Sequence, residues 1–304
     1  MTIIGGGGGV GSSAAFNLLL RGGCEVVLVD TRPNMVASHV LDLEQTLELG
    51  AGRSVRGGDD QDVVDADVVV LAGGAPLVLN TSRLVYLDAH TAMVDGLAER
   101  LLAAGDAWRG LLVMVTNPVD PLCTLLWRRT GIDRHRIVGY TLNDTLRLRT
   151  GIGRALGVEP GRVDAWVLGE HGDASVPLLD RVRVDGKPVE LTAGQRAAAE
   201  EFLRTWYVRH VALDSGRTST WTSGLGVARI VDAILRPAPG IWPASVVLAG
   251  EYGIDGVSVG VPVSLGRGGV EEIHEWELAP DDLAALQRSA ALVRELTERI
   301  DVAG

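Results

Sequence analysis

The glycine run Gly5–Gly9, which directly follows two apolar residues, constrains the fold of this chain more than any other feature. Together with the next two residues it contains the spacing Gly-x-Gly-x-x-Gly, and residues 12–20 then follow a helical apolar pattern. Between a strand and a helix, this spacing gives a tight turn and a close approach of the backbone to a pyrophosphate. The anion then lies at the amino end of the helix. A polyglycine run satisfies this pattern partly by chance, so at this point two interpretations stay open: a flexible loop, and a dinucleotide-binding turn formed by Gly6, Gly8, Val10 and Gly11.

A second predicted strand, residues 25–29, ends at Asp30. A carboxylate at this place accepts hydrogen bonds from the adenosine ribose hydroxyls and repels a 2′-phosphate, which favours NAD over NADP. Arg32 keeps the alternative open, because a guanidinium group can accommodate that phosphate.

Two further apolar runs, residues 67–72 and 111–115, are separated by a helical stretch at 82–104. Apolar runs without alternation indicate strands that are buried on both faces, and their alternation with helices predicts an α/β fold with a doubly wound parallel sheet. Ligands bind at the carboxyl ends of such strands. The residues that follow these two runs are Gly73, Gly74, Ala75, Thr116 and Asn117, although Asn117-Pro118 alone would also suit a plain turn.

Charge and composition restrict the possible partners. The chain has 304 residues and a formal net charge of -11, so it has no basic excess to neutralise a nucleic acid or an anionic membrane. We expect no membrane-spanning segment, no secretion signal and a cytoplasmic location. Cys24 and Cys123 are expected to be reduced, buried thiols, and the histidines have no metal-ligand spacing, so no metal site is predicted.

His171 lies within Gly169-Glu170-His171-Gly172-Asp173, directly after an apolar run that is predicted to be a strand. An imidazole on a loop at a strand end, with carboxylates nearby, can deliver and accept a proton near neutral pH. Taken alone, this short motif would also suit a loop histidine without a special role.

Asp144 and Arg147 are predicted to lie one turn apart on one helix face. They could form an ordinary surface ion pair, worth less than about 1 kcal/mol. Alternatively, Asp144 orients the His171 imidazole and Arg147 binds a substrate carboxylate through its two-pronged guanidinium group. Arg83 is in the first turn of its predicted helix, where the helix dipole disfavours a cation, and this indicates either a function or a common surface arginine.

Six motifs in this order resemble the L-lactate and L-malate dehydrogenase family, and the resemblance extends over essentially the whole chain. They are Gly6-x-Gly8-x-x-Gly11, Asp30, Gly74-Ala75-Pro76 with Ser82-Arg83, Thr116-Asn117-Pro118-Val119-Asp120, Asp144-Thr145-x-Arg147-x-Arg149 and Gly169-Glu170-His171-Gly172-Asp173. The resemblance implies a Rossmann NAD-binding domain at residues 1–139 and an α+β substrate-binding and catalytic domain at residues 140–304. It also implies a homodimer or homotetramer.

The resemblance assigns roles to the residues of the predicted site. His171 would protonate the ketone oxygen of a 2-oxo acid, and Asp144 would hold its tautomer. Arg147 would bind the substrate carboxylate, Arg83 would polarise the carbonyl from a mobile lid, and Asn117 would reach the substrate. The residues implied to bind NAD are Gly6, Gly8, Val10, Gly11, Asp30, Gly73, Gly74, Ala75, Thr116 and Asn117.

Several positions depart from the family pattern. Leu77 stands where the family has arginine for malate and glutamine for lactate. A leucine offers no charge to a second carboxylate, so we expect an apolar 2-oxo acid. Residues 78–80 lack the usual Lys-Pro-Gly, which puts closure of the lid in doubt. The pocket threonine is Thr218 or Ser219, and Asp164 replaces the histidine of fructose-bisphosphate-activated relatives, so that effector is not expected.

Three rival functions remain. The first is a malate or lactate dehydrogenase proper that recognises its side chain by unfamiliar contacts. The second is an NAD-dependent glycosidase, which needs a divalent metal, although Thr116 occupies the place of its cysteine ligand. The third is a catalytically decayed NAD-binding regulator with an altered lid. Retention of all four candidate catalytic and substrate-binding side chains favours the NAD-dependent L-2-hydroxyacid dehydrogenase; they are Arg83, Asp144, Arg147 and His171.

Overall fold

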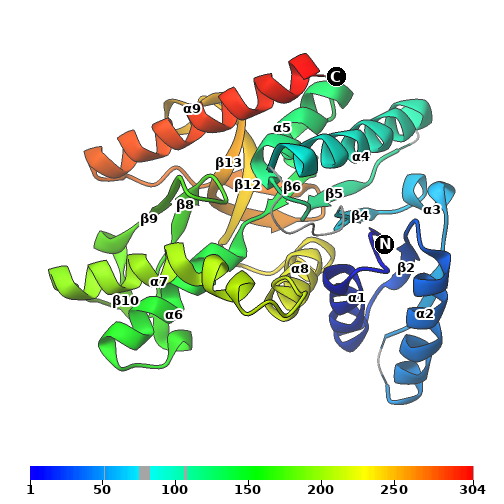
Figure 1. Cartoon of the computed structure of the whole chain (residues 1–304), viewed down its shortest axis with the longest axis horizontal. Helices are drawn as coiled ribbons and strands as arrows, with labels where there is room; N and C mark the ends of the chain where they lie inside the picture. The colour runs from blue at the N-terminus through cyan, green and yellow to red at the C-terminus, as the bar shows by residue number, and fades with distance from the viewer. Residues whose placement is uncertain (51, 75–82, 106–107, 304) are drawn as a thin grey trace.

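The computed structural model describes residues 1–50, 52–74, 83–105 and 108–303 (Figure 1). Strands and helices alternate through the first half of the chain. They are β1 (Thr2–Ile4), α1 (Gly9–Arg21), β2 (Glu25–Val29), α2 (Pro33–Glu48), β3 (Ser54–Gly57), α3 (Asp60–Val64), β4 (Val68–Leu71), α4 (Arg83–Ala104), β5 (Leu111–Met114), α5 (Val119–Thr130) and β6 (Ile137–Tyr140).

The second half mixes helices with antiparallel strands. Its longer elements are α6 (Leu142–Leu156), α7 (Ala193–Ala212), α8 (Thr220–Leu235), β12 (Trp242–Ala249), β13 (Asp255–Gly266), β14 (Gly269–Ile273) and α9 (Pro280–Ala303). Its short strands are β7 (Val163–Asp164), β8 (Val167–Gly169), β9 (Ser175–Pro177), β10 (Arg183–Val184) and β11 (Lys187–Pro188).

The strands of the described residues form one 11-stranded sheet and one 3-stranded sheet. The large sheet has the order β3-β2-β1-β4-β5-β6-β12-β13-β8-β9, with β14 paired to β13, and its first six strands run parallel. This arrangement confirms the predicted α/β fold with a Rossmann-type parallel sheet. Beyond β6 the pairing becomes antiparallel, so one continuous sheet joins both halves of the chain.

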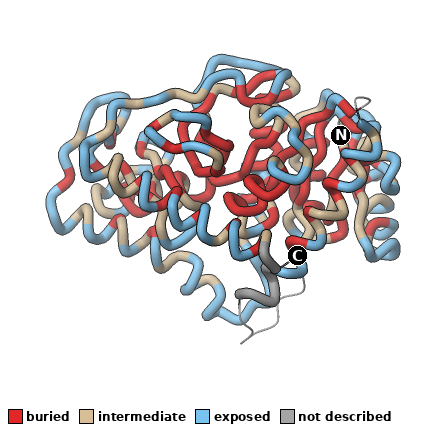
Figure 2. The backbone as a smooth tube through the Cα atoms, turned by 90° about the horizontal axis from the view of Figure 1, so that it is seen from above, coloured by how far each residue is buried: buried red, intermediate tan, exposed pale blue. Residues whose placement is uncertain are grey.

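The centre of the parallel sheet is buried, as the apolar runs predicted. All four residues of β4 and all four of β5 are buried. In Figure 2 the buried residues gather in the interior of the molecule, and the exposed residues lie around its outside. Helix α1 packs against α8, and α6 packs against α7. Within the described part of the chain, no helix is long and apolar enough to cross a membrane.

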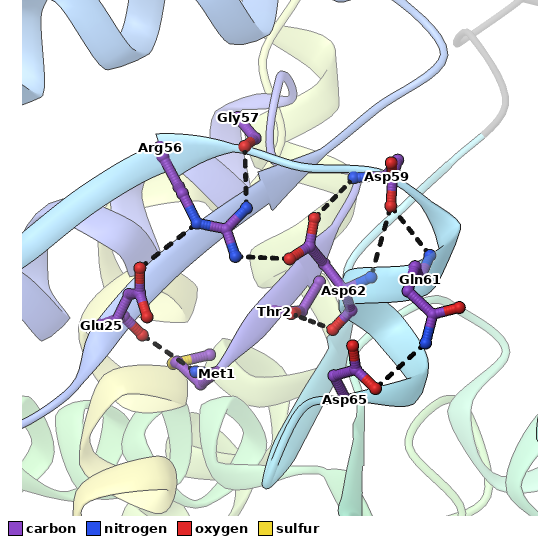
Figure 3. Close-up of polar contacts among 9 residues, drawn as sticks. All are labelled: Met1, Thr2, Glu25, Arg56, Gly57, Asp59, Gln61, Asp62 and Asp65. Atoms are coloured by element: carbon purple, nitrogen blue, oxygen red, sulfur yellow. Dashed lines mark hydrogen bonds and ion pairs between the residues drawn. The ribbon is translucent and has the colours of Figure 1, made fainter.

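Polar contacts join β2, β3 and α3 on the β3 side of the parallel sheet (Figure 3). Arg56 of β3 donates hydrogen bonds to Glu25 of β2 and to Asp62 of α3. Asp59 caps α3 in a capping box with Asp62, which satisfies free amides of the first turn. These contacts join neighbouring strands and a helix, so we interpret them as scaffold, whereas the predicted ligand-binding residues follow the carboxyl ends of the strands.

Candidate active site

The carboxyl ends of four parallel strands lie at one edge of the sheet. Ile4 pairs with Val29 and with Leu71, and Leu71 pairs with Met114. This register aligns the segments that follow these strands, which hold the glycine run, Asp30, Gly73 and Thr116.

The glycine run forms a tight turn over the end of β2. The amides of Gly5 and Gly6 both donate to the carbonyl oxygen of Val29, at 2.8 Å and 3.0 Å, and Gly8 donates to the oxygen of Gly5 at 3.0 Å. Helix α1 then begins at Gly9, three residues before the predicted start, with Gly8 as its N-cap residue. The turn therefore presents the amino end of a helix, where a phosphate binds well.

Side chains would not fit at the key glycines. A Cβ on Gly11 would lie 2.3 Å from the oxygen of Gly5, and a Cβ on Gly5, whose φ is +83°, would lie 2.4 Å from the amide nitrogen of Gly73. A Cβ on Gly6 would lie 2.9 Å from Leu28. Bare backbone thus brings β1, α1 and the end of β4 together, as a dinucleotide-binding turn requires.

Asp30 lies directly beside this turn. Its Oδ2 accepts a hydrogen bond from the amide of Gly7 at 3.0 Å, and its Oδ1 accepts from the backbone and Nε of Arg32, both at 3.0 Å. Burial raises the pKa of Asp30, but the hydrogen bonds from Arg32 and Gly7 outweigh it and hold this pKa below its usual value. Asp30 is therefore a carboxylate at neutral pH, suited to ribose hydroxyls.

Thr116 links the ends of β4 and β5. Its Oγ1 donates toward the oxygens of Leu71, at 3.2 Å, and Gly73, at 2.6 Å. Next to it, Asn117 precedes a cis peptide bond to Pro118, and its carbonyl oxygen lies 2.6 Å from Nδ1 of His90. Ala75 and Leu77 lie outside the described residues. Arg83 is the first residue of α4, and its side chain lies outside the described part of the structure.

His171 lies in the turn between β8 and β9 and faces α6. Its Nδ1 lies 2.5 Å from Oδ2 of Asp144, and the two side chains are 13% and 10% exposed. A carboxylate only accepts, so Nδ1 carries the proton and Nε2 remains available for proton exchange with a substrate. The other oxygen of Asp144 accepts from Nη1 of Arg147 at 3.2 Å.

The charges of this cluster favour a protonated imidazole. Burial lowers the pKa of His171. The charge and hydrogen bond of Asp144 and the charge of Asp120 raise it by more than burial lowers it, so this pKa lies above its usual value. Burial also lowers the pKa of Arg147. The structure thus brings together His171, Asp144 and Arg147, which are separated along the chain.

The structure places both candidates for the pocket threonine in the segment directly before α8. Thr218 is exposed and lines a cavity of about 530 Å³ between α1 and α2, and Ser219 is the N-cap residue of α8 without a side-chain capping bond. Thr220, the first residue of α8, faces the glycine turn, because a Cβ on Gly9 would lie 3.3 Å from its Oγ1.

Two more residues at this site were not predicted. Asp120 accepts a hydrogen bond from the backbone amide of His171 at 2.7 Å. The ring of Trp206 lies 4.2 Å from the guanidinium carbon of Arg147. Among the described residues, no three His, Cys, Asp or Glu side chains form a group that could hold a metal ion.

Two family models match nearly the whole chain. The model described as lactate/malate dehydrogenase, NAD binding domain, matches residues 1–139, and the alpha/beta C-terminal domain of the same family matches residues 141–303.

Malate dehydrogenases and lactate dehydrogenases are both among the proteins similar to this chain. A malate dehydrogenase of Halobacterium salinarum is 36% identical and is covered over 95% of both chains. An L-lactate dehydrogenase 1 of Bifidobacterium longum is also 36% identical, covering 97% of this chain and 96% of its own. A solved malate dehydrogenase of Aeropyrum pernix superposes with a TM-score of 0.91 at 29% identity, covering 98% of each chain.

The glycine turn and Asp30 fit NAD, and the match of both domains extends this fit to the whole chain. The chain therefore belongs to the lactate/malate dehydrogenase family and is an NAD-dependent 2-hydroxy acid dehydrogenase.

Proposed function

We propose that this enzyme interconverts a 2-oxo acid that has an apolar side chain and the corresponding L-2-hydroxy acid. The observation that carries the reaction type is the contact of His171 with Asp144, whose second oxygen binds Arg147. A proton donor and a carboxylate-binding guanidinium group are the two functions that reduction of a 2-oxo acid requires from the protein.

Each residue of the cluster has a distinct role in this proposal. His171 donates its Nε2 proton to the carbonyl oxygen during reduction and takes it back during oxidation. Asp144 holds the imidazole and stabilises its protonated form. Arg147 binds the substrate carboxylate, and Arg83 polarises the carbonyl. NADH, when bound, supplies the hydride.

The glycine turn and its neighbours would hold the cofactor. Gly6, Gly8, Val10 and Gly11 would bind the pyrophosphate, and Asp30 would bind the adenosine ribose. Residues at the ends of β4 and β5 would contact the nicotinamide half, namely Gly73, Gly74, Ala75, Thr116 and Asn117.

The choice of an apolar substrate rests on Leu77. A malate dehydrogenase and a lactate dehydrogenase match this chain at the same 36% identity, so overall similarity does not select a side chain. Leucine has no group to pair with a second carboxylate, and an unpaired buried charge costs binding.

The test is NADH consumption with pyruvate, with branched and aromatic 2-oxo acids, and with oxaloacetate. The proposal expects turnover of apolar 2-oxo acids and little turnover of oxaloacetate. Leu77→Arg should then gain oxaloacetate activity, and Leu79→Arg is the matched control that should not. Preference of the wild type for oxaloacetate would overturn the role of Leu77. Absence of turnover with every acid would favour an NAD-binding regulator.

We also propose that the chain divides after Gly139 into its two domains and assembles into a homodimer or homotetramer in the cytoplasm. Apolar side chains on the paired helices α1 and α8 support self-association, since Leu20 is 58% exposed and Trp221 is 69% exposed. Light scattering of the purified protein measures the assembly, and a monomeric mass would contradict it.

A further inference from the structure

Asp120 is a buried acid next to the turn between β8 and β9, which contains His171. It lies in the first turn of α5 and is only 1% exposed. An aspartate in this place usually faces solvent and interacts with the amino end of its helix. Burying an unpaired carboxylate costs free energy, so a buried Asp120 needs specific hydrogen-bond partners.

The two oxygens of Asp120 have different partners. Oδ2 accepts from the backbone amide of His171 at 2.7 Å, and Oδ1 accepts from Oγ of Ser245 at 2.5 Å. Asp120 thus connects α5 and β12 to the turn that carries His171.

A buried network fixes the position of this carboxyl group. Oγ of Ser245 lies 2.7 Å from Oγ of Ser258, and Ser245 and Ser258 are 0% exposed. The amide of Ser258 donates to Oγ1 of Thr124, which itself donates to the carbonyl oxygen of Asp120. Because every member is bonded, the network holds the carboxyl group rigidly.

We propose that Asp120 is a positioning residue that holds the His171 main chain and increases the affinity of its imidazole for a proton. This inference rests on the proposed role of His171 in proton transfer. Asp144 acts on the same imidazole from α6, so two carboxylates from two helices would set its protonation.

The charged groups around this pair come from several elements. Asp144 and Arg147 face His171 from α6, and Glu170 and Asp173 flank it on its own turn. Burial outweighs the hydrogen bonds from Ser245 and the His171 amide and the charge of His171, so the pKa of Asp120 is raised to about 7. Its own helix adds Cys123, a thiol whose raised pKa keeps it neutral. Asp144, and Asp120 above the pH at which it ionises, therefore favour the protonated imidazole.

Asp120→Asn tests this role because the amide keeps an acceptor for the His171 amide but carries no charge. The pKa of His171 is measured by nuclear magnetic resonance of the ¹⁵N-histidine-labelled protein without added ligand, with the signal assigned by its loss in His171→Asn. Above about pH 7, where Asp120 is ionised, the substitution removes a negative charge next to the imidazole, so we expect the pKa of His171 to fall by at least about half a unit. The limb of kcat/KM for 2-oxo acid reduction that requires protonated His171 should shift to lower pH by the same amount.

Two further variants separate positioning from general stability. Ser245→Ala removes one donor to Asp120, raises the proton affinity of that carboxyl group and should lower the pKa of His171 in the same direction. Ser258→Ala removes a hydroxyl of equal burial but leaves both bonds to the carboxyl group, so it should leave this pKa unchanged.

An unchanged pKa of His171 in Asp120→Asn and in Ser245→Ala would overturn the inference. Lower activity with an unmoved pH profile would do the same, because it would indicate a purely structural role. Absence of turnover by the wild type would contradict the proposed function, and the resonance titration would still test Asp120.

Discussion

The guanidinium carbon of Arg147 lies 4.2 Å from the centre of the Trp206 ring, so the proposed substrate clamp is held between two helices. Asp144 of α6 binds one of its nitrogens, and Trp206 of α7 covers its face. Stacking on an aromatic ring leaves the guanidinium edge available to a carboxylate. The arginine is thereby oriented before a substrate binds.

Replacing Trp206 with leucine should therefore weaken substrate binding more than turnover. Loss of the stacking energy, about 1 to 2 kcal/mol, predicts a KM for the 2-oxo acid that rises roughly fivefold to thirtyfold. Steady-state kinetics measure the change. Trp276→Leu is the matched control, because it removes a ring that lies 4.7 Å from Arg181 instead. An unchanged KM in Trp206→Leu would show that the ring does not orient the clamp.

Asp30→Ser should reduce the preference for NADH over NADPH. The substitution removes the proposed acceptor for the ribose hydroxyls and releases Arg32, which can then approach a 2′-phosphate. Loss of hydrogen bonds to a charged group, about 1.5 to 3 kcal/mol, predicts a KM for NADH that rises at least about tenfold. The ratio of kcat/KM for the two cofactors measures the preference, and an unaltered ratio would argue against this role of Asp30.

Asp120 should make the folded protein less stable as the pH rises. Its pKa is raised to about 7 in the folded protein and is about 3.9 in an unfolded chain. Between these values the folded protein retains a proton that the unfolded chain has lost, so the free energy of unfolding falls with increasing pH. His171 acts in the same direction at higher pH, because the stability it contributes when protonated is lost as the pH rises through its raised pKa.

Urea unfolding between about pH 4 and pH 7 measures this dependence. Asp120→Asn should show a smaller fall in the free energy of unfolding over that range. Asp42→Asn, which changes an exposed residue of α2, should retain the fall of the wild type. Equal slopes in the wild type and Asp120→Asn would show that Asp120 is ionised throughout.

Local sequence patterns were sufficient to predict the parallel sheet and the turn before α1. The spacing of Gly6, Gly8 and Gly11 reflects contacts within one strand–turn–helix unit, so a short segment encodes it. Likewise, Asp144 and Arg147 lie one turn apart on one helix, and a helical period alone brings them together.

Contacts between distant segments could not be predicted in this way. Asp120 has the pattern of an ordinary acid at a helix start, and nothing nearby indicates that it binds the amide of His171. Trp206 of α7 contacts Arg147 of α6, and the local sequence of either helix does not indicate that the two helices pack together. The antiparallel pairing of β6 with β12, which continues the sheet into the second half, depends on residues about a hundred positions apart.

The most direct test of this account compares NADH binding and 2-oxo acid reduction in the wild type and His171→Asn. We predict that the variant binds NADH with nearly the affinity of the wild type, because the glycine turn and Asp30 are untouched. Its kcat should fall by at least about a hundredfold, since a general acid contributes a factor of about 10² to 10⁴. A variant that retains the turnover of the wild type would remove His171 from the mechanism and contradict the account.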